Sequence, residues 1–254
     1  MRVGILGAGP LGVAVAGPLR RGEVAGCTAA GVVTSASSER DRDEFADRCE
    51  VVVEAAGVGA VADRVAPLLR RGRDVVLCSS AALADPVVAA RLARRAPGRV
   101  LVPSGAIGGL DVCRAATRGD PCAQVRLTTT KRSDAVGGGT GEIFRGSARE
   151  AALAFPRTAN VAATLALATV GFDAVEVVVC ADPAAFRTRH EIEVESRLGH
   201  YRTTVENTVA PGSGGRTSAV TAWSVIVLLE TLAAGAPPPQ PGCTVAVVPG
   251  LSAP

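Results

Sequence analysis

The stretch that decides the fold is RVGILGAGPLG, residues 2–12. A short apolar run leads directly into G-A-G-P-L-G, and residues 13–19 then read as the start of a helix. A strand, then G-x-G-x-x-G, then a helix is the context that a dinucleotide-binding turn requires. The first glycine permits the tight turn, the second lets the backbone approach a pyrophosphate, and the third lets the helix pack closely on the strand.

This turn predicts a dinucleotide site, and a plain glycine-rich strand–helix turn is the alternative. The pyrophosphate is expected at the helix N-terminus, where free N–H groups and the helix dipole favour an anion. The residues predicted to contact the cofactor here are Gly7, Gly9, Pro10, Leu11 and Gly12.

Composition narrows the classes of partner. A chain of 254 residues that is 48% hydrophobic can form one large domain or two modest domains with real cores. Aromatic residues are only 3% and no basic stripe is interleaved with them, so we expect no nucleic-acid partner. No run of about 18 apolar residues is free of charges and turn signals, so we expect no membrane span.

The cysteines and histidines argue against disulfides and metals. The seven cysteines are scattered, odd in number and never spaced C-x-x-C, which fits free thiols in a reducing cytoplasm. The two histidines belong to no cluster of potential ligands, so no metal site is expected. We predict a cytoplasmic protein whose partner is a small molecule.

Strands and helices alternate through the first hundred residues. Strands are predicted over 28–33, 50–54, 74–80 and 100–103, and helices over 58–71 and 86–95. Alternation at such short spacing predicts a parallel, doubly wound sheet that binds its ligand at the carboxyl ends of the strands.

The end of the second strand bears on the choice of cofactor. An acidic residue at this place selects the free ribose 2′-hydroxyl, whereas hydroxyls and arginine suit a 2′-phosphate. Here Thr34 and Ser35 follow the strand, with Arg40 and Arg42 nearby. We therefore predict NADP, or the use of both NADP and NAD. The turn after the third strand, Ala55-Ala56, is also predicted to contact the cofactor.

After Pro103 the pattern changes. A glycine-rich elbow, residues 104–111, leads into a helix over 111–117 and a strand over 124–131. Residues 134–141 read as a flexible loop, and helices are predicted over 148–155 and 160–169. Segments 174–181, 190–197 and 201–206 read as antiparallel strands of a second sheet, and 217–233 as a long helix.

Several blocks of the chain resemble L-aspartate dehydrogenases, and they occur in the same order. The resemblance covers about residues 1–232, and P-S-G-A-I-G and N-V-A-A-T-L are its most specific motifs. The blocks are Pro103–Asp111, Phe155–Leu165, Ala181–Pro183, His190–Ile192 and Arg216–Ser218.

The resemblance implies a fold, a reaction and an assembly. The reaction is NAD- or NADP-dependent oxidation of L-aspartate to iminoaspartate, which hydrolyses to oxaloacetate and ammonia. The fold is α/β: a Rossmann doubly wound parallel sheet, with a second α+β domain that carries an open mixed or antiparallel sheet. The last helix returns to the first domain, which gives boundaries of 1–107 plus 216–254 and 108–215. The open sheet helps to form a homodimer.

The resemblance also implies site residues. The catalytic histidine of the family falls on His190, and its nicotinamide contacts fall on Ala106 and Asn160. An imidazole titrates near neutrality, so it can accept the proton of a substrate ammonium; a structural, hydrogen-bonded histidine is the alternative. Asn160 is also predicted to bind substrate or to cap its helix, and backbone N–H groups of the elbow at Ser104 are predicted to line the cleft.

Lys131 is the only lysine among 27 basic residues. A compact ammonium whose pKa shifts on burial does a task that arginine cannot, although a stray residue in a skewed composition is the alternative. The strand over 124–131 is expected to end at the pocket. We therefore predict that Lys131 binds a substrate carboxylate through a charge-assisted contact.

Three threonines depart from the family pattern. Thr130 stands where the family usually has arginine, and Thr158 and Thr188 stand where it usually has asparagine. Thr188 is predicted to contact substrate. These departures leave two other hypotheses open: an imine reductase or a dehydrogenase of a different amino or oxo acid, and a catalytically silent nucleotide-binding protein.

Overall fold

The computed structural model describes residues 1–94, 96–214, 217–235 and 244–245. Its glycine turn joins strand β1 (Arg2–Leu6) to helix α1 (Pro10–Arg21), as predicted. Gly7 has a φ of +113°, which a residue with a side chain rarely adopts. A Cβ on Gly12 would overlap the carbonyl oxygen of Gly7, so α1 can approach β1 this closely only without a side chain there.

The first sheet has the strand order β11-β5-β4-β3-β1-β2. All its pairs are parallel except that of β11 with β5. The chain runs from β1 outward to β2 and then returns to the other side of β1 to form β3. This reversal creates a switch point at the carboxyl ends of β1 and β3, where open α/β sheets bind ligands. The other strands are β2 (Thr28–Val33), β3 (Val51–Glu54), β4 (Asp74–Leu77), β5 (Val100–Pro103) and β11 (Thr244–Val245).

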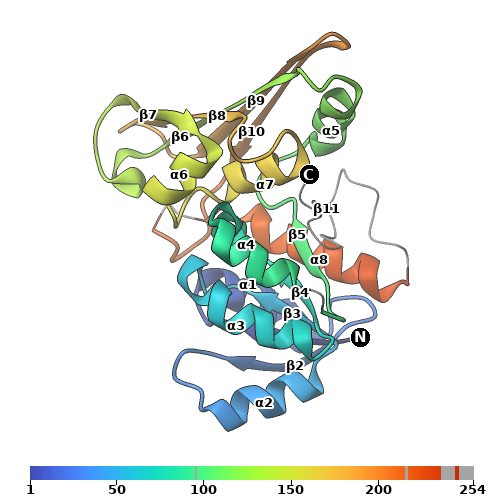
Figure 1. Ribbon diagram of the computed structural model, residues 1–254. Helices are drawn as coiled ribbons and strands as arrows, with labels where there is room; N and C mark the ends of the chain where they lie inside the picture. Colours follow the sequence, from blue (N-terminus) through green and yellow to red (C-terminus); the bar gives the residue numbers. More distant parts are fainter. Residues whose placement is uncertain (95, 215–216, 236–243, 246–254) are drawn as a thin grey trace.

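Helices cover both faces of this sheet (Figure 1). Helices α1 and α8 (Val220–Ala233) share one apolar cluster with strand residues such as Val3 and Ile5. Helices α2 (Glu39–Arg48), α3 (Val58–Arg70) and α4 (Pro86–Ala93) pack on the opposite face through Phe45, Val65 and Leu92. Burial on both faces explains why the strands read as continuous apolar runs. We call the sheet with these helices the first lobe.

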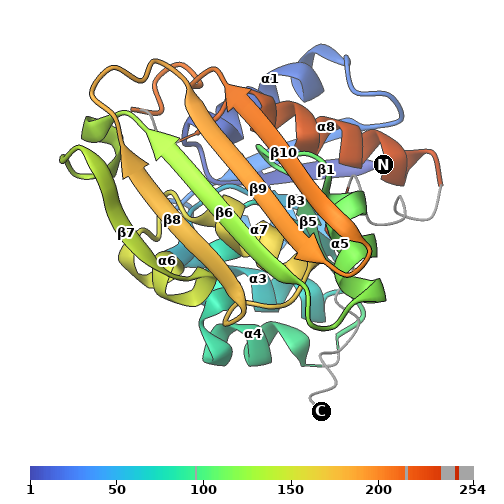
Figure 2. The same ribbon diagram turned by 90° about the horizontal axis from the view of Figure 1, so that it is seen from above.

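The second lobe contains a mixed sheet with the order β10-β9-β6-β8-β7. Helices α5, α6 and α7 cover one face of it, and no other described element lies over the face turned toward the viewer in Figure 2. These elements are β6 (Gln124–Lys131), β7 (Gly141–Ser147), β8 (Val175–Ala181), β9 (Thr188–Ser196), β10 (Gly199–Asn207), α5 (Leu110–Gly119), α6 (Ala148–Ala154) and α7 (Asn160–Ala168).

Two details of this sheet differ from the prediction. Strand β8 pairs with β6 in parallel, because α6 and α7 carry the chain back across the sheet before β8 begins. Strand β7 was not predicted: its segment, GEIFRGS, follows a run of glycines and carries glycines of its own, which mask the alternation of a strand. The predicted loop ends where β7 begins.

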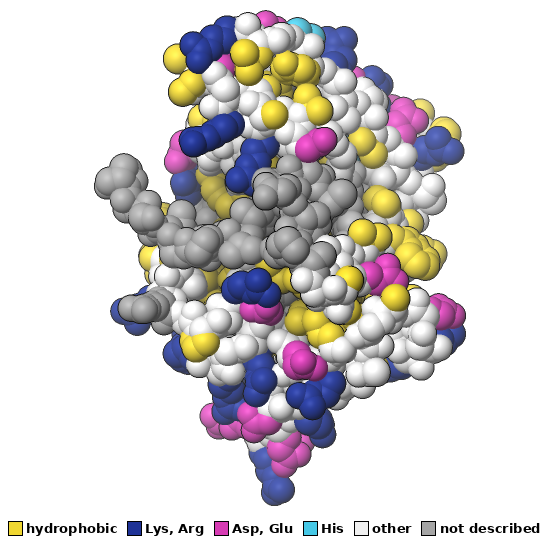
Figure 3. Space-filling view, turned by 90° about the vertical axis from the view of Figure 1, so that its right-hand side faces the viewer, with side chains coloured by type: hydrophobic (Ala, Val, Ile, Leu, Met, Phe, Trp, Pro, Cys, Tyr) yellow, Lys and Arg dark blue, Asp and Glu magenta, His cyan; other side chains and the backbone are white. Residues whose placement is uncertain are grey.

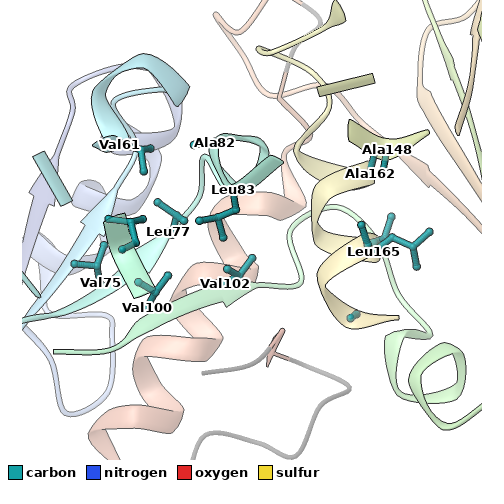
Figure 4. Close-up of a cluster of buried hydrophobic side chains, with 14 of the residues drawn as sticks. Val61, Val75, Leu77, Ala82, Leu83, Val100, Val102, Ala148, Ala162 and Leu165 are labelled. Carbon is teal, nitrogen blue, oxygen red and sulfur yellow. The ribbon is translucent and has the colours of Figure 1, made fainter. Parts of the chain in front are cut away.

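The two lobes share one apolar core. A short 3-10 helix, η1 (Ser80–Ala84), follows β4 and packs against α7. Figure 4 shows the core passing from Leu77 and Leu83 of the first lobe to Ala162 and Leu165 of the second. Small residues at this contact, Ala81 and Ala163 among them, let the backbones approach closely. The relative position of the lobes is therefore set by close packing.

Charges of both signs are interspersed at the end of the molecule that carries α2 (Figure 3). Arg40 pairs with Glu44 at 2.8 Å, and Arg71 pairs with Asp43 at 2.6 Å. None of the helices in the described part of the chain is long and apolar enough to cross a membrane.

Candidate active site

A small cleft lies between the two lobes. The glycine turn, the elbow after β5 and the second sheet all contribute to its walls, so the structure brings together segments far apart in the sequence. From the residues predicted to form the site it collects Leu11, Ser104, Ala106, Lys131, Asn160 and His190. We call this the interlobe cleft.

His190 lies on β9, opposite the last residues of β6. It pairs in register with Thr129, and the Thr129 hydroxyl lies 3.0 Å from Nδ1 of the imidazole. The His190 side chain is almost wholly buried, with 1% of its surface exposed. Because Thr129 occupies Nδ1, Nε2 is the nitrogen left for a ligand in the cleft.

Lys131 is two residues beyond Thr129 and therefore on the same face of β6. Its side chain is buried, and no ion pair to an acidic group is formed with it among the described residues. Burial lowers the pKa of the Lys131 ammonium to about 8. Burial and, as the smaller cause, the positive charge of Lys131 together lower the pKa of His190 to about 3. At neutral pH the cleft therefore holds a neutral imidazole and a protonated amine.

Asn160 is the first residue of α7, and it does not cap that helix. Its side-chain oxygen accepts a hydrogen bond from the backbone N–H of Ala81 at 3.0 Å. Ser80 donates to the main-chain oxygen of Asn160 at 3.0 Å and lies 3.2 Å from the Thr164 hydroxyl. These contacts fix the amide, so its NH₂ group is the part that can donate to a ligand.

The elbow after β5 is held from two sides. The N–H of Gly105 donates to Ser224 of α8 at 3.2 Å, and the Asn207 amide donates to the carbonyl of Ala106 at 2.9 Å. The predicted use of the elbow's N–H groups as cleft donors therefore does not extend to Gly105, because α8 already occupies it.

The glycine turn fits a dinucleotide. A Cβ added to Gly9 would meet no atom within 4 Å, so the backbone there faces open space. Gly9 precedes α1 and no side chain caps that helix, while Pro10 occupies its first turn. The first N–H groups of α1 are thus available to an anion, as a pyrophosphate requires.

Glu54 is a buried acid that the sequence reasoning missed. Its carboxylate accepts hydrogen bonds from the N–H groups of Ala56 at 2.8 Å and Gly57 at 3.0 Å, and from the N–H and hydroxyl of Ser79 at 2.9 and 3.0 Å. Burial nevertheless raises the pKa of Glu54. This carboxylate ties the turn after β3 to the turn after β4. The only signal in the sequence was a lone acid closing an apolar strand.

These contacts also define what the turn after β3 can offer a cofactor. The N–H of Ala55 donates to the Leu6 carbonyl at 2.8 Å, and that of Ala56 to Glu54. The N–H groups of both alanines are therefore already hydrogen-bonded, and the turn that contains them lies next to Gly7.

The loop after β2 is folded on itself. Thr34 accepts a hydrogen bond from the Ala36 N–H at 3.2 Å, and its own N–H donates to Ser37 at 3.0 Å. Arg42 donates to the Ser35 carbonyl at 3.1 Å. Arg40 is instead 87% exposed and engaged with Glu44. Of the two arginines predicted near the ribose, Arg42 is the one held against this loop.

The three threonines that depart from the family pattern lie in different parts of the structure. Thr158 lines the interlobe cleft. Thr130 does not, because successive residues of β6 point to opposite faces and Lys131 takes the cleft side. Thr188, predicted to contact substrate, lines a different hollow, together with Arg132 and Arg187.

Other residues of the cleft had no predicted role. No sequence pattern indicated a role for Arg157, which lies three residues before Asn160, or for the hydroxyl side chains in and just before α8. These residues are Cys78, Ser80, Arg157, Thr164, Thr217, Ser218 and Thr221. The described residues contain no group of three or more His, Cys, Asp or Glu side chains that could hold a metal ion.

Comparison with known proteins identifies both halves of the chain. Residues 7–99 match the family model for the NAD-binding domain of homoserine dehydrogenase, and residues 111–232 match the model for the C-terminal part of aspartate dehydrogenase. The L-aspartate dehydrogenase of Bradyrhizobium diazoefficiens is 33% identical, with 91% of each chain covered. That of Methanothermobacter thermautotrophicus is 36% identical, covering 91% of this chain and 96% of the other.

A solved structure agrees with these matches. The crystal structure of aspartate dehydrogenase from Thermotoga maritima superposes with a TM-score of 0.70 and 30% sequence identity, covering 91% of this chain and 96% of that one. The shared NAD-binding half, the shared C-terminal half and the full-length relatives show that this chain belongs to the aspartate dehydrogenase family of oxidoreductases.

Proposed function

We propose that this protein is an NAD(P)-dependent L-aspartate dehydrogenase and that the interlobe cleft is its active site. One observation carries the proposal: the cleft joins a glycine turn shaped for a dinucleotide to a buried imidazole and a buried ammonium. Burying a lysine without an acidic partner destabilises the fold. Such a buried ammonium is expected where it serves to bind an anionic ligand. This argues against a catalytically silent protein.

The dinucleotide would lie on the turn of Gly7, Gly9 and Gly12, with Leu11, Ala106 and the Asn160 amide toward the nicotinamide end. When bound, the cofactor supplies the acceptor for the hydride that leaves the substrate Cα. Lys131 binds a substrate carboxylate and orients the amine toward His190. Nε2 of His190 accepts the ammonium proton and releases it to solvent, and the neutral imidazole then accepts a proton from the water that attacks the imine.

The charge of Lys131 links substrate binding to this proton transfer. Burial is the larger cause of the low pKa of His190 and the charge of Lys131 is the smaller one, and a bound carboxylate offsets that smaller cause. The pKa of the imidazole then rises toward the range in which it is an effective base. Substrate binding and activation of the base are thereby coupled.

The case for a different amino acid is reduced by the placement of the threonines. Thr130 lies outside the cleft and Thr158 lines it, while Thr188 lines another hollow, two residues before His190 on β9. Ser104, Asn160 and Thr188 remain proposed substrate contacts.

We further propose NADP as the preferred cofactor. Arg42 is held by Ser35 next to the loop where a ribose 2′-phosphate would lie, and no acid follows β2 directly.

For the domains we propose the boundaries 1–107 plus 216–254 and 108–215, since α8 packs on α1; residues 236–243 and 246–254 lie outside the described residues. Cytoplasmic localisation is supported by the cysteines of the described residues, all six of which are free thiols.

We propose that two chains associate through the uncovered face of the second sheet. Thr128 lies on β6, the central strand of that sheet, and nearby arginines are paired across strands, Arg126 with Glu176 at 2.6 Å among them. A face whose charges are already paired can be covered at a lower desolvation cost.

The catalytic proposal is tested with the two histidines. We expect His190→Gln to lower kcat for L-aspartate by about 10²- to 10⁴-fold, because general-base catalysis is lost. Cofactor affinity, measured by the fluorescence of Trp223, is expected to stay unchanged. His200→Gln is the matched control, since His200 lies exposed on β10. Unchanged turnover in His190→Gln would refute the role of His190, and a wild-type rate on aspartate no better than on alanine would refute the substrate.

The Lys131 proposal predicts a pH dependence. Succinate, a dicarboxylate without an amine, should inhibit competitively with aspartate. Lys131 is protonated below its pKa of about 8 and loses its charge above it, so the inhibition constant should rise as pH increases beyond 8. In Lys131→Met the constant should be higher and independent of pH over this range. A flat profile in the wild type would contradict the assignment.

Cofactor preference is tested with the two arginines near the loop after β2. Arg42→Glu should raise KM for NADP about tenfold or more through the loss of a charge-assisted contact, and should change KM for NAD much less. Arg40→Glu is the control, because Arg40 points to solvent. Equal effects of Arg42→Glu on both nucleotides would count against the 2′-phosphate contact.

Assembly is tested by sedimentation equilibrium. The wild type should have the mass of a dimer and Thr128→Arg that of a monomer, because an arginine at the centre of the face disturbs close packing. Thr28→Arg, at an exposed position on the edge strand β2, should leave the mass unchanged. A monomeric wild type would end this proposal.

A further inference from the structure

The interlobe cleft contains a second cation. Arg157 lines it together with Lys131, and no acidic side chain of the described residues lines it. Arg157 differs from Lys131 in being exposed, which places its guanidinium at the mouth of the cleft. Unlike Arg126, Arg145 or Arg149 of the same lobe, it forms no ion pair with another described residue.

The turn that carries Arg157 is held in place. It connects α6 to α7, and the N–H groups of Thr158 and Ala159 donate to the Phe155 carbonyl at 2.9 and 3.0 Å. Asn160, three residues after Arg157, is fixed in turn by its contact with Ala81. The backbone from which the guanidinium extends is therefore anchored next to the proposed substrate site.

Two cations without an acid suit a ligand with two negative groups. A lysine is a compact charge for one carboxylate, whereas a guanidinium forms two parallel hydrogen bonds with another. Thr130 stands where the family usually has arginine, but a side chain at this position points away from the cleft and could not be the second cation. Resting on the proposed function, we propose that Arg157 binds the side-chain carboxylate of the substrate and makes the site specific for dicarboxylic amino acids.

The test measures binding as well as turnover. In protein saturated with NADP, titration calorimetry compares succinate with butyrate, which has the same chain length and one carboxylate fewer. Arg157→Gln should weaken succinate about 10- to 100-fold, the range for loss of a hydrogen-bonded charge pair, and should leave butyrate unchanged. Arg157→Lys should restore part of the affinity. Arg114→Gln, at an exposed position on α5 outside the cleft, should change neither ligand.

Kinetics separate the carboxylate from a cofactor phosphate. If Arg157 binds substrate, Arg157→Gln raises KM for L-aspartate and leaves KM for NADP unchanged. A raised KM for NADP, or equal weakening of succinate and butyrate, would overturn the proposal. A wild-type protein that binds succinate through Arg157 but oxidises no amino acid would refute the proposed reaction and leave the dicarboxylate site intact.

Discussion

The whole arrangement depends on the contact between helix α1 and strand β1. The helix can start where it does only because Gly12 has no side chain to meet the carbonyl oxygen of Gly7. This contact points the first N–H groups of the helix at the switch point of the sheet. Glu54 then ties the two neighbouring turns together from inside, so the floor of the nucleotide site is one hydrogen-bonded unit.

The second lobe contributes the side chains of His190 and Lys131 to the cleft. The register between β6 and β9 places Thr129 opposite His190, and strand alternation adds Lys131 on the same side. Both polar groups are removed from water, and this burial is the main cause that lowers the pKa of each. The charge of Lys131 adds to the effect on His190 as the smaller cause.

The two lobes are joined by a packed apolar core. Alanines at η1, α6 and α7 let the two halves share a packed core, and this core holds the cleft at a defined width. The elbow after β5 is fixed by Ser224 and Asn207, one from each side. Precise placement of a reacting centre requires such rigidity, because small displacements cost much of the rate.

The sequence alone determined the features that depend on neighbours in the chain. The glycine turn and the alternating strands and helices of the first lobe were predictable, since local conformation specifies them. Lys131 stood out as the only lysine, whereas its burial depends on the second sheet. The motif blocks led to the family. Strand β7 escaped prediction because its glycines hide the alternation of a strand.

Only the tertiary structure decided which residues share the cleft. Thr130 and Lys131 are adjacent in sequence, yet the pleat of β6 sends them to opposite faces. Thr188 is two residues from His190, yet it lines another hollow. Glu54 is hydrogen-bonded to Ser79 of the next turn, and Arg157 lines the same cleft as Lys131, although each pair is far apart along the chain. Side-chain direction and long-range packing set these relations, and neither is written in local sequence pattern.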